Sequence, residues 1–226
     1  MGAPQGFLAP APARRVCGGG LEMTGAQYAE RTLVAYRMHA GRAAANWARA
    51  QRKPSVFLKR FAAGLPPGGR ALDYGCGIGC EMAWLRRLGF RVEGVDGTLD
   101  FAEAARRRNP GVRVIGLPFS ACRLEGGRYD GIWSNAALIH LPPAVFRSEL
   151  QKLRRALVPG GRLGLTLAWG RRKGVLTGDW IPGRYFACYT LPEALRFLKG
   201  WRVLEARTAV GEERSGRWIR ILAEGQ

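Results

Sequence analysis

Apolar residues along this chain follow two periods, one typical of buried strands and the other of amphipathic helices. Helical spacing is clearest in 144–157, where Phe146, Leu150, Leu153 and Leu157 share one face. Further helices are predicted over 54–65, 81–88 and 99–108, and after Thr190. A short apolar run that ends at Leu72 predicts the first strand, and further strands are predicted at 91–95, 112–115, 129–133 and 163–167. Strands and helices that alternate in this way predict an α/β fold, a mostly parallel sheet with helices on both faces.

The C-terminal part departs from this alternation. The stretch 169–189 has no clear period and is expected to be irregular, although its length favours a functional role. Strands are predicted over 201–207 and 217–223 with no helix between them. The sheet is therefore expected to have seven strands, one of them antiparallel at its edge.

The chain divides into three parts by composition. Residues 1–20 are rich in Pro, Ala and Gly without any period, and a flexible segment is predicted. Residues 21–53 predict one or two helices, whose aromatic residues Tyr28, Tyr36 and Trp47 either fold over a ligand as a lid or simply pack the helices together. Residues 54–226 form the main domain.

The composition of the 226 residues excludes several classes of protein. An apolar share of 47% excludes a disordered chain, and no apolar run reaches the ~18 residues that a membrane helix needs. The N-terminus lacks the apolar core of a signal peptide. Five scattered cysteines and two histidines favour reduced thiols over disulfides and give little support to a metal site. A cytoplasmic protein is expected.

The formal net charge of +19 has two interpretations. A basic chain can bind a polyanion such as RNA. However, only five of the 36 basic residues are lysine, which indicates a compositional bias toward arginine. Several arginines also fall in the last turn of a predicted helix, where cations complement the helix dipole.

A glycine-rich turn joins the first predicted strand of the main domain to a helix. Gly75, Gly77 and Gly79 alternate with other residues directly after that strand. Glycines let the backbone adopt positive φ and let a ligand approach the main chain, and the helix start offers free N–H groups. This predicts a nucleotide or nucleoside pocket. The third glycine comes one residue too early for a dinucleotide fingerprint, and the P-loop sequence is absent.

Together with the preceding acid, Asp73, the turn resembles the first motif of class I S-adenosylmethionine-dependent methyltransferases, [DE]-x-G-x-G-x-G. The resemblance implies a Rossmann-like methyltransferase fold and S-adenosylmethionine as cofactor. It also implies cofactor contacts from Asp73, Gly75, Cys76, Gly77 and Gly79.

Further cofactor contacts are expected at the ends of the next strands. Asp96 lies 23 residues after Asp73, at the tip of the second strand, where a carboxylate can accept the ribose hydroxyls or else cap a helix. Gly97 and Thr98 follow it. No acid follows the third strand, so we expect Leu117 and Phe119 to contact adenine through apolar surface. Asn135, after the fourth strand, is expected to border the methyl group.

Catalytic and substrate-binding residues are less firmly indicated. His140 lies just beyond the fourth strand, either as a general base or as a packed histidine bonded to the main chain. Residues Tyr28, Tyr36, Arg171, Arg184 and Tyr185 are candidates for acceptor binding. We expect methyl transfer to a small molecule at oxygen or nitrogen. An RNA methyltransferase, chiefly for tRNA, and a non-catalytic nucleoside-binding scaffold are the alternatives.

Overall fold

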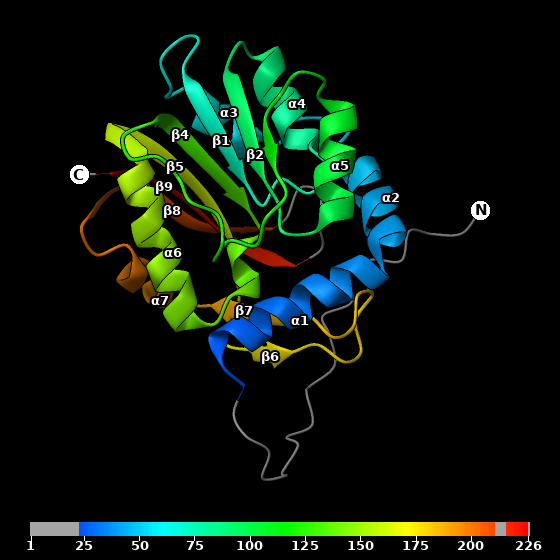
Figure 1. Cartoon of the computed structure of the whole chain (residues 1–226). Coiled ribbons are helices and arrows are strands. Elements are labelled where there is room, and N and C mark those ends of the chain that lie inside the picture. Colours follow the sequence, from blue (N-terminus) through cyan, green and yellow to red (C-terminus); the bar gives the residue numbers. More distant parts are fainter. Residues whose placement is uncertain (1–22, 211–215, 226) are drawn as a thin grey trace.

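The computed structural model describes residues 23–210 and 216–225, so the segment predicted to be flexible, 1–20, lies outside the described residues. A central sheet carries helices on both faces (Figure 1). The strands are β1 (Arg70–Tyr74), β2 (Arg91–Val95), β3 (Val114–Ile115), β4 (Tyr129–Asn135), β5 (Leu157–Trp169), β6 (Lys173–Val175), β7 (Tyr185–Tyr189), β8 (Trp201–Val210) and β9 (Arg217–Gly225).

The parallel half of the sheet has the order β3-β2-β1-β4-β5. The order reverses between β1, which leads outward to β2 and β3, and β4, which leads the other way. In an open α/β sheet, ligands bind beyond the carboxyl ends of the strands at such a reversal. The ends of β1 and β4 therefore locate the site.

The prediction of seven strands was wrong, because the described residues form nine. The two extra strands, β6 and β7, lie in the stretch expected to be irregular. The antiparallel strand was also placed wrongly. β9 lies between β5 and β8 and is antiparallel to both, which leaves β8 at the edge. The reason is burial, since Ile219, Ile221 and Ala223 of β9 are fully buried whereas most of β8 is exposed or half-buried.

Strand β7 continues the line of β4 beyond its end. β5 pairs with β4 as far as Thr166, and with β7 at Ala168 and Trp169. At Ala168 the other side of β5 is taken by β9, so β7 must lie on the side of β4. This arrangement places β7 directly beyond the carboxyl end of β4.

The helices cover both faces and one end of the sheet. They are α1 (Gly25–Met38), α2 (Ala40–Ala50), α3 (Val56–Ala62), α4 (Cys80–Arg87), α5 (Leu99–Arg108), the short 3₁₀ helix η1 (Leu138–His140), α6 (Pro143–Ala156) and α7 (Leu191–Phe197). Helices α3, α4 and α5 pack against one face, and α6 and α7 against the other. Figure 1 shows α1 and α2 lying across the end toward which the parallel strands point.

The helix starts follow local sequence signals. Thr24 and Thr190 each form a capping box, α1 with Gln27 and α7 with Glu193. Helix α3 begins at Val56 and not at Pro54, because the Ser55 side chain caps it. No helix in the described ranges is long and apolar enough to cross a membrane.

Candidate active site

The glycine turn after β1 has the conformation that its sequence predicts. Gly75, Gly77 and Gly79 have φ of 88°, 51° and 75°. The N–H groups of Gly75 and Cys76 donate to the carbonyl of Val95 at 2.8 and 2.9 Å, which ties the turn to the end of β2. A Cβ on Gly75 would come within 2.2 Å of the Cβ of Ala137. Glycine is therefore required here by both conformation and space.

Asp96 holds the glycine turn from the tip of β2. Its Oδ2 accepts from the Gly77 N–H and its Oδ1 from the Thr98 N–H, both at 2.8 Å. Burial raises the pKa of Asp96 to about 6, although these hydrogen bonds oppose the shift. The Thr98 side chain also hydrogen-bonds this carboxylate. A carboxylate has about four lone-pair directions, so one remains through which a ligand hydroxyl can bind.

Asp73 is a buried acid whose carboxyl oxygens lack a well-placed hydrogen-bond donor. Its side chain is 1% exposed, and neither oxygen makes a hydrogen bond of acceptable geometry to the described residues. Burial raises its pKa well above the usual value, and the negative charges of Glu81 and Asp96 raise it further. Glu81 accepts from Asn135 Nδ2 at 2.9 Å. The strand ends thus concentrate negative charge in a chain that is otherwise strongly basic.

A second group of contacts fixes the loop after β3. The ring of Phe119 stacks on that of Tyr74, with centroids 4.2 Å apart. Lys152 of α6 donates to the carbonyl of Phe119 at 2.5 Å and to that of Cys122 at 3.3 Å. Glu149 pairs with Lys152 at 2.7 Å and accepts from the Tyr74 hydroxyl at 2.6 Å. Helix α6 therefore holds this loop, although residues 116–120 directly after β3 include no acid.

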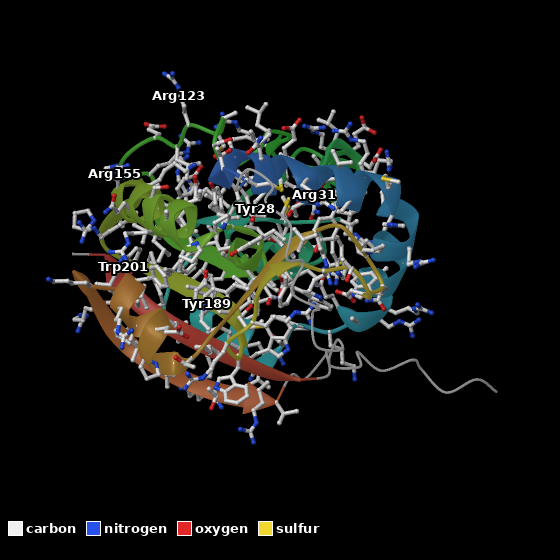
Figure 2. The ribbon with its side chains drawn as sticks, turned by 90° about the horizontal axis from the view of Figure 1, so that it is seen from below. Tyr28, Arg31, Arg123, Arg155, Tyr189 and Trp201 are labelled. Carbon is white, nitrogen blue, oxygen red and sulfur yellow. The ribbon has the colours of Figure 1, made fainter. Side chains whose placement is uncertain are left out.

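These elements enclose a cavity of about 250 Å³. Helix α1 lines it with residues that include Leu33 and Tyr36, and α2 lines it with Trp47. A Cβ on Gly77 would lie 3.2 Å from the Trp47 ring, so α2 packs directly on the glycine turn. Arg31, labelled on α1 in Figure 2, donates to the carbonyl of Gly183 at 3.0 Å and fastens α1 to the segment before β7.

Four polar residues from distant segments meet beside the cavity, and three of them line it. The Tyr36 hydroxyl lies 2.8 Å from His140 Nε2 and accepts from Arg184 Nη1 at 2.8 Å. His140 Nδ1 lies 2.8 Å from the carbonyl oxygen of Tyr185. Asp179 pairs with Arg184 Nη2. The side chains of Tyr36, His140 and Arg184 are buried, with residue exposures of 8%, 9% and 3%.

Most of the residues expected at the site meet in this cavity, which is lined by Gly75, Cys76, Gly77, Asp96, Gly97, Thr98, Phe119, Asn135, His140, Tyr36 and Arg184. Asp73 and Gly79, also expected to contact the cofactor, do not line the cavity. Leu117 is 45% exposed and does not line the cavity. Tyr28 and Arg171 are not part of the lining, although Tyr28 packs on Tyr185 with ring centroids 4.8 Å apart. Tyr185 does not line the cavity either, but its carbonyl oxygen lies 2.8 Å from His140 Nδ1.

Sequence reasoning missed several residues at the site. Glu81, Trp180, Phe186 and Trp218 line the cavity, and Asp179 holds Arg184. Glu81 could have been predicted from the sequence, because it stands in the first turn of the helix that follows the glycine motif. The others come from the irregular stretch and the last strand, where no local pattern predicts contact with the glycine turn.

The sequence of this chain is similar to those of known methyltransferases. Residues 71–161 match a family model described as a methyltransferase domain. Methyltransferase GfsG of Streptomyces halstedii is 34% identical over 108 residues, which are 43% of this chain and 37% of that protein. Ribosomal RNA small subunit methyltransferase C of Chromohalobacter salexigens is 40% identical over 114 residues, 46% of this chain and 33% of that protein. The matched segment thus spans about a third of the length of these relatives.

A solved structure extends the likeness over most of the chain. The 1,6-didemethyltoxoflavin-N1-methyltransferase of Burkholderia thailandensis, with bound 1,6-didemethyltoxoflavin and S-adenosylhomocysteine, superposes with a TM-score of 0.75. The match covers 92% of this chain and 93% of that one at 21% identity, and it shows a shared fold. The cofactor of this family is S-adenosylmethionine. Residues 71–161 thus match a methyltransferase domain, and the chain shares its fold with an S-adenosylmethionine-dependent methyltransferase.

Proposed function

We propose that this protein transfers the methyl group of S-adenosylmethionine to an oxygen or nitrogen of a small molecule. One observation carries the proposal. The cavity at the switch point joins an acidic, glycine-lined part at β1 and β2 to a second part that contains Tyr36, His140 and Arg184. A cofactor and an acceptor can therefore meet in one enclosed space.

The residues of the first part fit this cofactor. S-adenosylmethionine carries positive charges on its sulfonium and its amino group, beside one carboxylate, and the acidic side chains of Glu81 and Asp96 line this part of the cavity. The glycine turn leaves room where a side chain would stand. We assign the ribose hydroxyls to Asp96 and the adenine to the apolar surface of Phe119, with the turn residues on the remaining part. Leu117 is exposed, so it would contact only the edge of the adenine ring.

The cofactor supplies an electrophilic methyl group. The protein's task is to hold the acceptor in line with it and to take up the acceptor's proton. His140 is suited to that second task because its Nδ1 faces a carbonyl oxygen, which can only accept. The proton of the neutral ring thus lies on Nδ1, and Nε2 is the basic nitrogen. Tyr36 and Arg184 confine the acceptor, and α1 and α2 act as a lid over both ligands.

The enclosure by α1, α2 and β7 supports a small acceptor, and the N1-methyltransferase with the same fold is crystallised with one. An RNA acceptor is supported by the net charge of +19 and by the ribosomal RNA methyltransferase among the relatives. Arg123 and Arg155 do not line the cavity, and they point outward at the edge of the molecule in Figure 2. Cys76, Cys122 and Cys188 form no disulfide among the described residues, which supports a reducing, cytoplasmic location.

Calorimetry with S-adenosylmethionine and a methyl-transfer screen over small molecules and total RNA test this proposal. Cofactor binding with turnover of a small molecule supports it. Turnover of RNA alone, with an affinity that falls steeply as salt rises and a slope reduced by replacing Arg171, Arg172 and Lys173, would favour the RNA alternative. Binding without any turnover would favour a nucleoside-binding scaffold.

His140→Ala tests the assigned base. We expect kcat to fall by roughly 10²–10⁴ while cofactor affinity stays close to that of the parent, because Nε2 lies at the acceptor end of the cavity. The acid limb of the pH–rate profile should disappear as well. Full activity with only a lowered melting temperature would show that His140 is structural.

A further inference from the structure

The residue best placed to take the acceptor's proton first is Tyr36, not His140. Both ring nitrogens of His140 already have partners, Nδ1 at the Tyr185 carbonyl and Nε2 at the Tyr36 hydroxyl, each at 2.8 Å. An acceptor molecule can reach Nε2 directly only if Tyr36 leaves. The Tyr36 hydroxyl therefore stands between the acceptor space and the base.

The hydrogen bonds around the Tyr36 hydroxyl determine which neighbour receives its proton. Arg184 has only donors, so the hydroxyl oxygen accepts from Nη1 and must donate its own proton elsewhere. Nε2 of the neutral His140 ring is the acceptor that remains. A hydroxyl oxygen has two lone pairs. One is used by Arg184, and the other is left for a proton from the acceptor molecule.

Arg184 is held so that it can stabilise negative charge on this oxygen. Asp179 binds its Nη2, and the guanidinium lies 5.4–5.7 Å from the ring centres of Tyr36, Trp180 and Phe186. At 3% exposure it cannot turn away to solvent. A buried guanidinium beside the hydroxyl disfavours an ammonium group as the acceptor, because like charges repel.

We propose that Tyr36 and His140 form a two-residue proton relay, and that the acceptor is an aromatic compound with a weakly acidic O–H or ring N–H. This rests on the proposed methyl transfer. The acceptor's X–H bond breaks as its proton goes to the Tyr36 oxygen, and the Tyr36 proton passes to His140 Nε2. The electron pair left on X forms the new bond to the methyl carbon. The S–CH₃ bond breaks and its electron pair stays on sulfur. His140 ends as an imidazolium held by the Tyr185 carbonyl.

The surroundings support the aromatic acceptor. The rings of Phe186, Trp180 and Trp218 line the same cavity as Tyr36 and Arg184. Flat apolar walls of this kind bury a planar ring, whereas the relay offers a proton path only to a group that has an acidic hydrogen.

Nitrogen NMR of the imidazole tests the relay without any acceptor. The chain has two histidines, and His39→Gln leaves the signals of His140 alone. In neutral protein we expect Nδ1 protonated and Nε2 unprotonated and hydrogen-bonded. Tyr36→Phe should shift the Nε2 resonance and leave Nδ1 in place. Tyr189→Phe is the matched control, because it removes a buried hydroxyl that has no hydrogen-bond partner in the described structure. A protonated Nε2, or no shift in Tyr36→Phe, would overturn the relay.

Kinetics with substituted phenols as probes test the acceptor class. Tyr36→Phe should slow 4-methoxyphenol by roughly 10²–10⁴ and 4-nitrophenol, which is largely ionised at pH 8, by far less. Tyr36→Phe/His140→Ala should be no slower than the slower single variant, because the two act as a unit. Equal losses on both phenols would overturn the relay. A parent that methylates other compounds but no phenol or ring N–H would overturn the acceptor class. A parent that methylates nothing refutes the proposed function, and the NMR result still decides the relay.

Discussion

Replacing Asp96 by alanine tests the cofactor pocket where the structure gives the most contacts. The carboxylate accepts from the Gly77 and Thr98 N–H groups at 2.8 Å and also bonds the Thr98 side chain, and a lone-pair direction remains for a ribose hydroxyl. A hydrogen bond to a charged group contributes ~1.5–3 kcal/mol. With about 1.4 kcal/mol for each factor of ten, the Kd of S-adenosylmethionine should rise roughly 10- to 150-fold.

The assay is titration calorimetry at pH 8, where Asp96 is ionised. Asp100→Ala is the matched control, because it removes an exposed carboxylate from the first turn of α5, close in sequence to Asp96. Its Kd should stay within about a factor of two of the parent value, since a lone exposed charge contributes little. The Asp96 variant should also melt at a lower temperature, because two backbone N–H groups lose their acceptor.

The melting temperature separates the two roles of Asp96. Both variants are compared at a temperature where each is fully folded. If Asp96→Ala then binds the cofactor as tightly as Asp100→Ala, the carboxylate only shapes the turn and our assignment of the ribose site is refuted.

Three further predictions concern the same pocket. Gly77→Val should nearly abolish cofactor binding in calorimetry, because its φ is 51° and a Cβ would already lie 3.2 Å from Trp47; unchanged affinity would contradict the assigned turn. Burial raises the pKa of Asp96 to about 6, so its contribution to the stability of the free protein falls as pH rises from about 4 to 6. Affinity for the cationic cofactor should rise up to about tenfold from pH 5 to 7, and a flat profile would contradict this. Lys152→Met should weaken cofactor binding severalfold by freeing the carbonyl of Phe119, whereas the exposed Lys199→Met should not.

The sequence by itself determined the parts of this protein that depend on local structure. Outside residues 169–189, where two strands were missed, the order of strands and helices follows from hydrophobic period, and helix α5 has the predicted bounds, 99–108. The turn with Gly75, Gly77 and Gly79 could be identified because positive φ in a short strand-to-helix connection requires glycine at those positions. Asp96 could be placed near that turn because one strand–helix–strand unit has a nearly fixed length.

Tertiary structure decided everything that depends on contacts between distant segments. Tyr36 meets His140 across 104 residues and Arg184 across 148, and no local pattern encodes such a meeting. Strand β7 brings the Tyr185 carbonyl to His140 only because β5 extends beyond the end of β4 and leaves room for another partner there. Likewise, β9 lies between β5 and β8 because both of its faces are buried, which hydrophobic period alone does not distinguish from an edge strand.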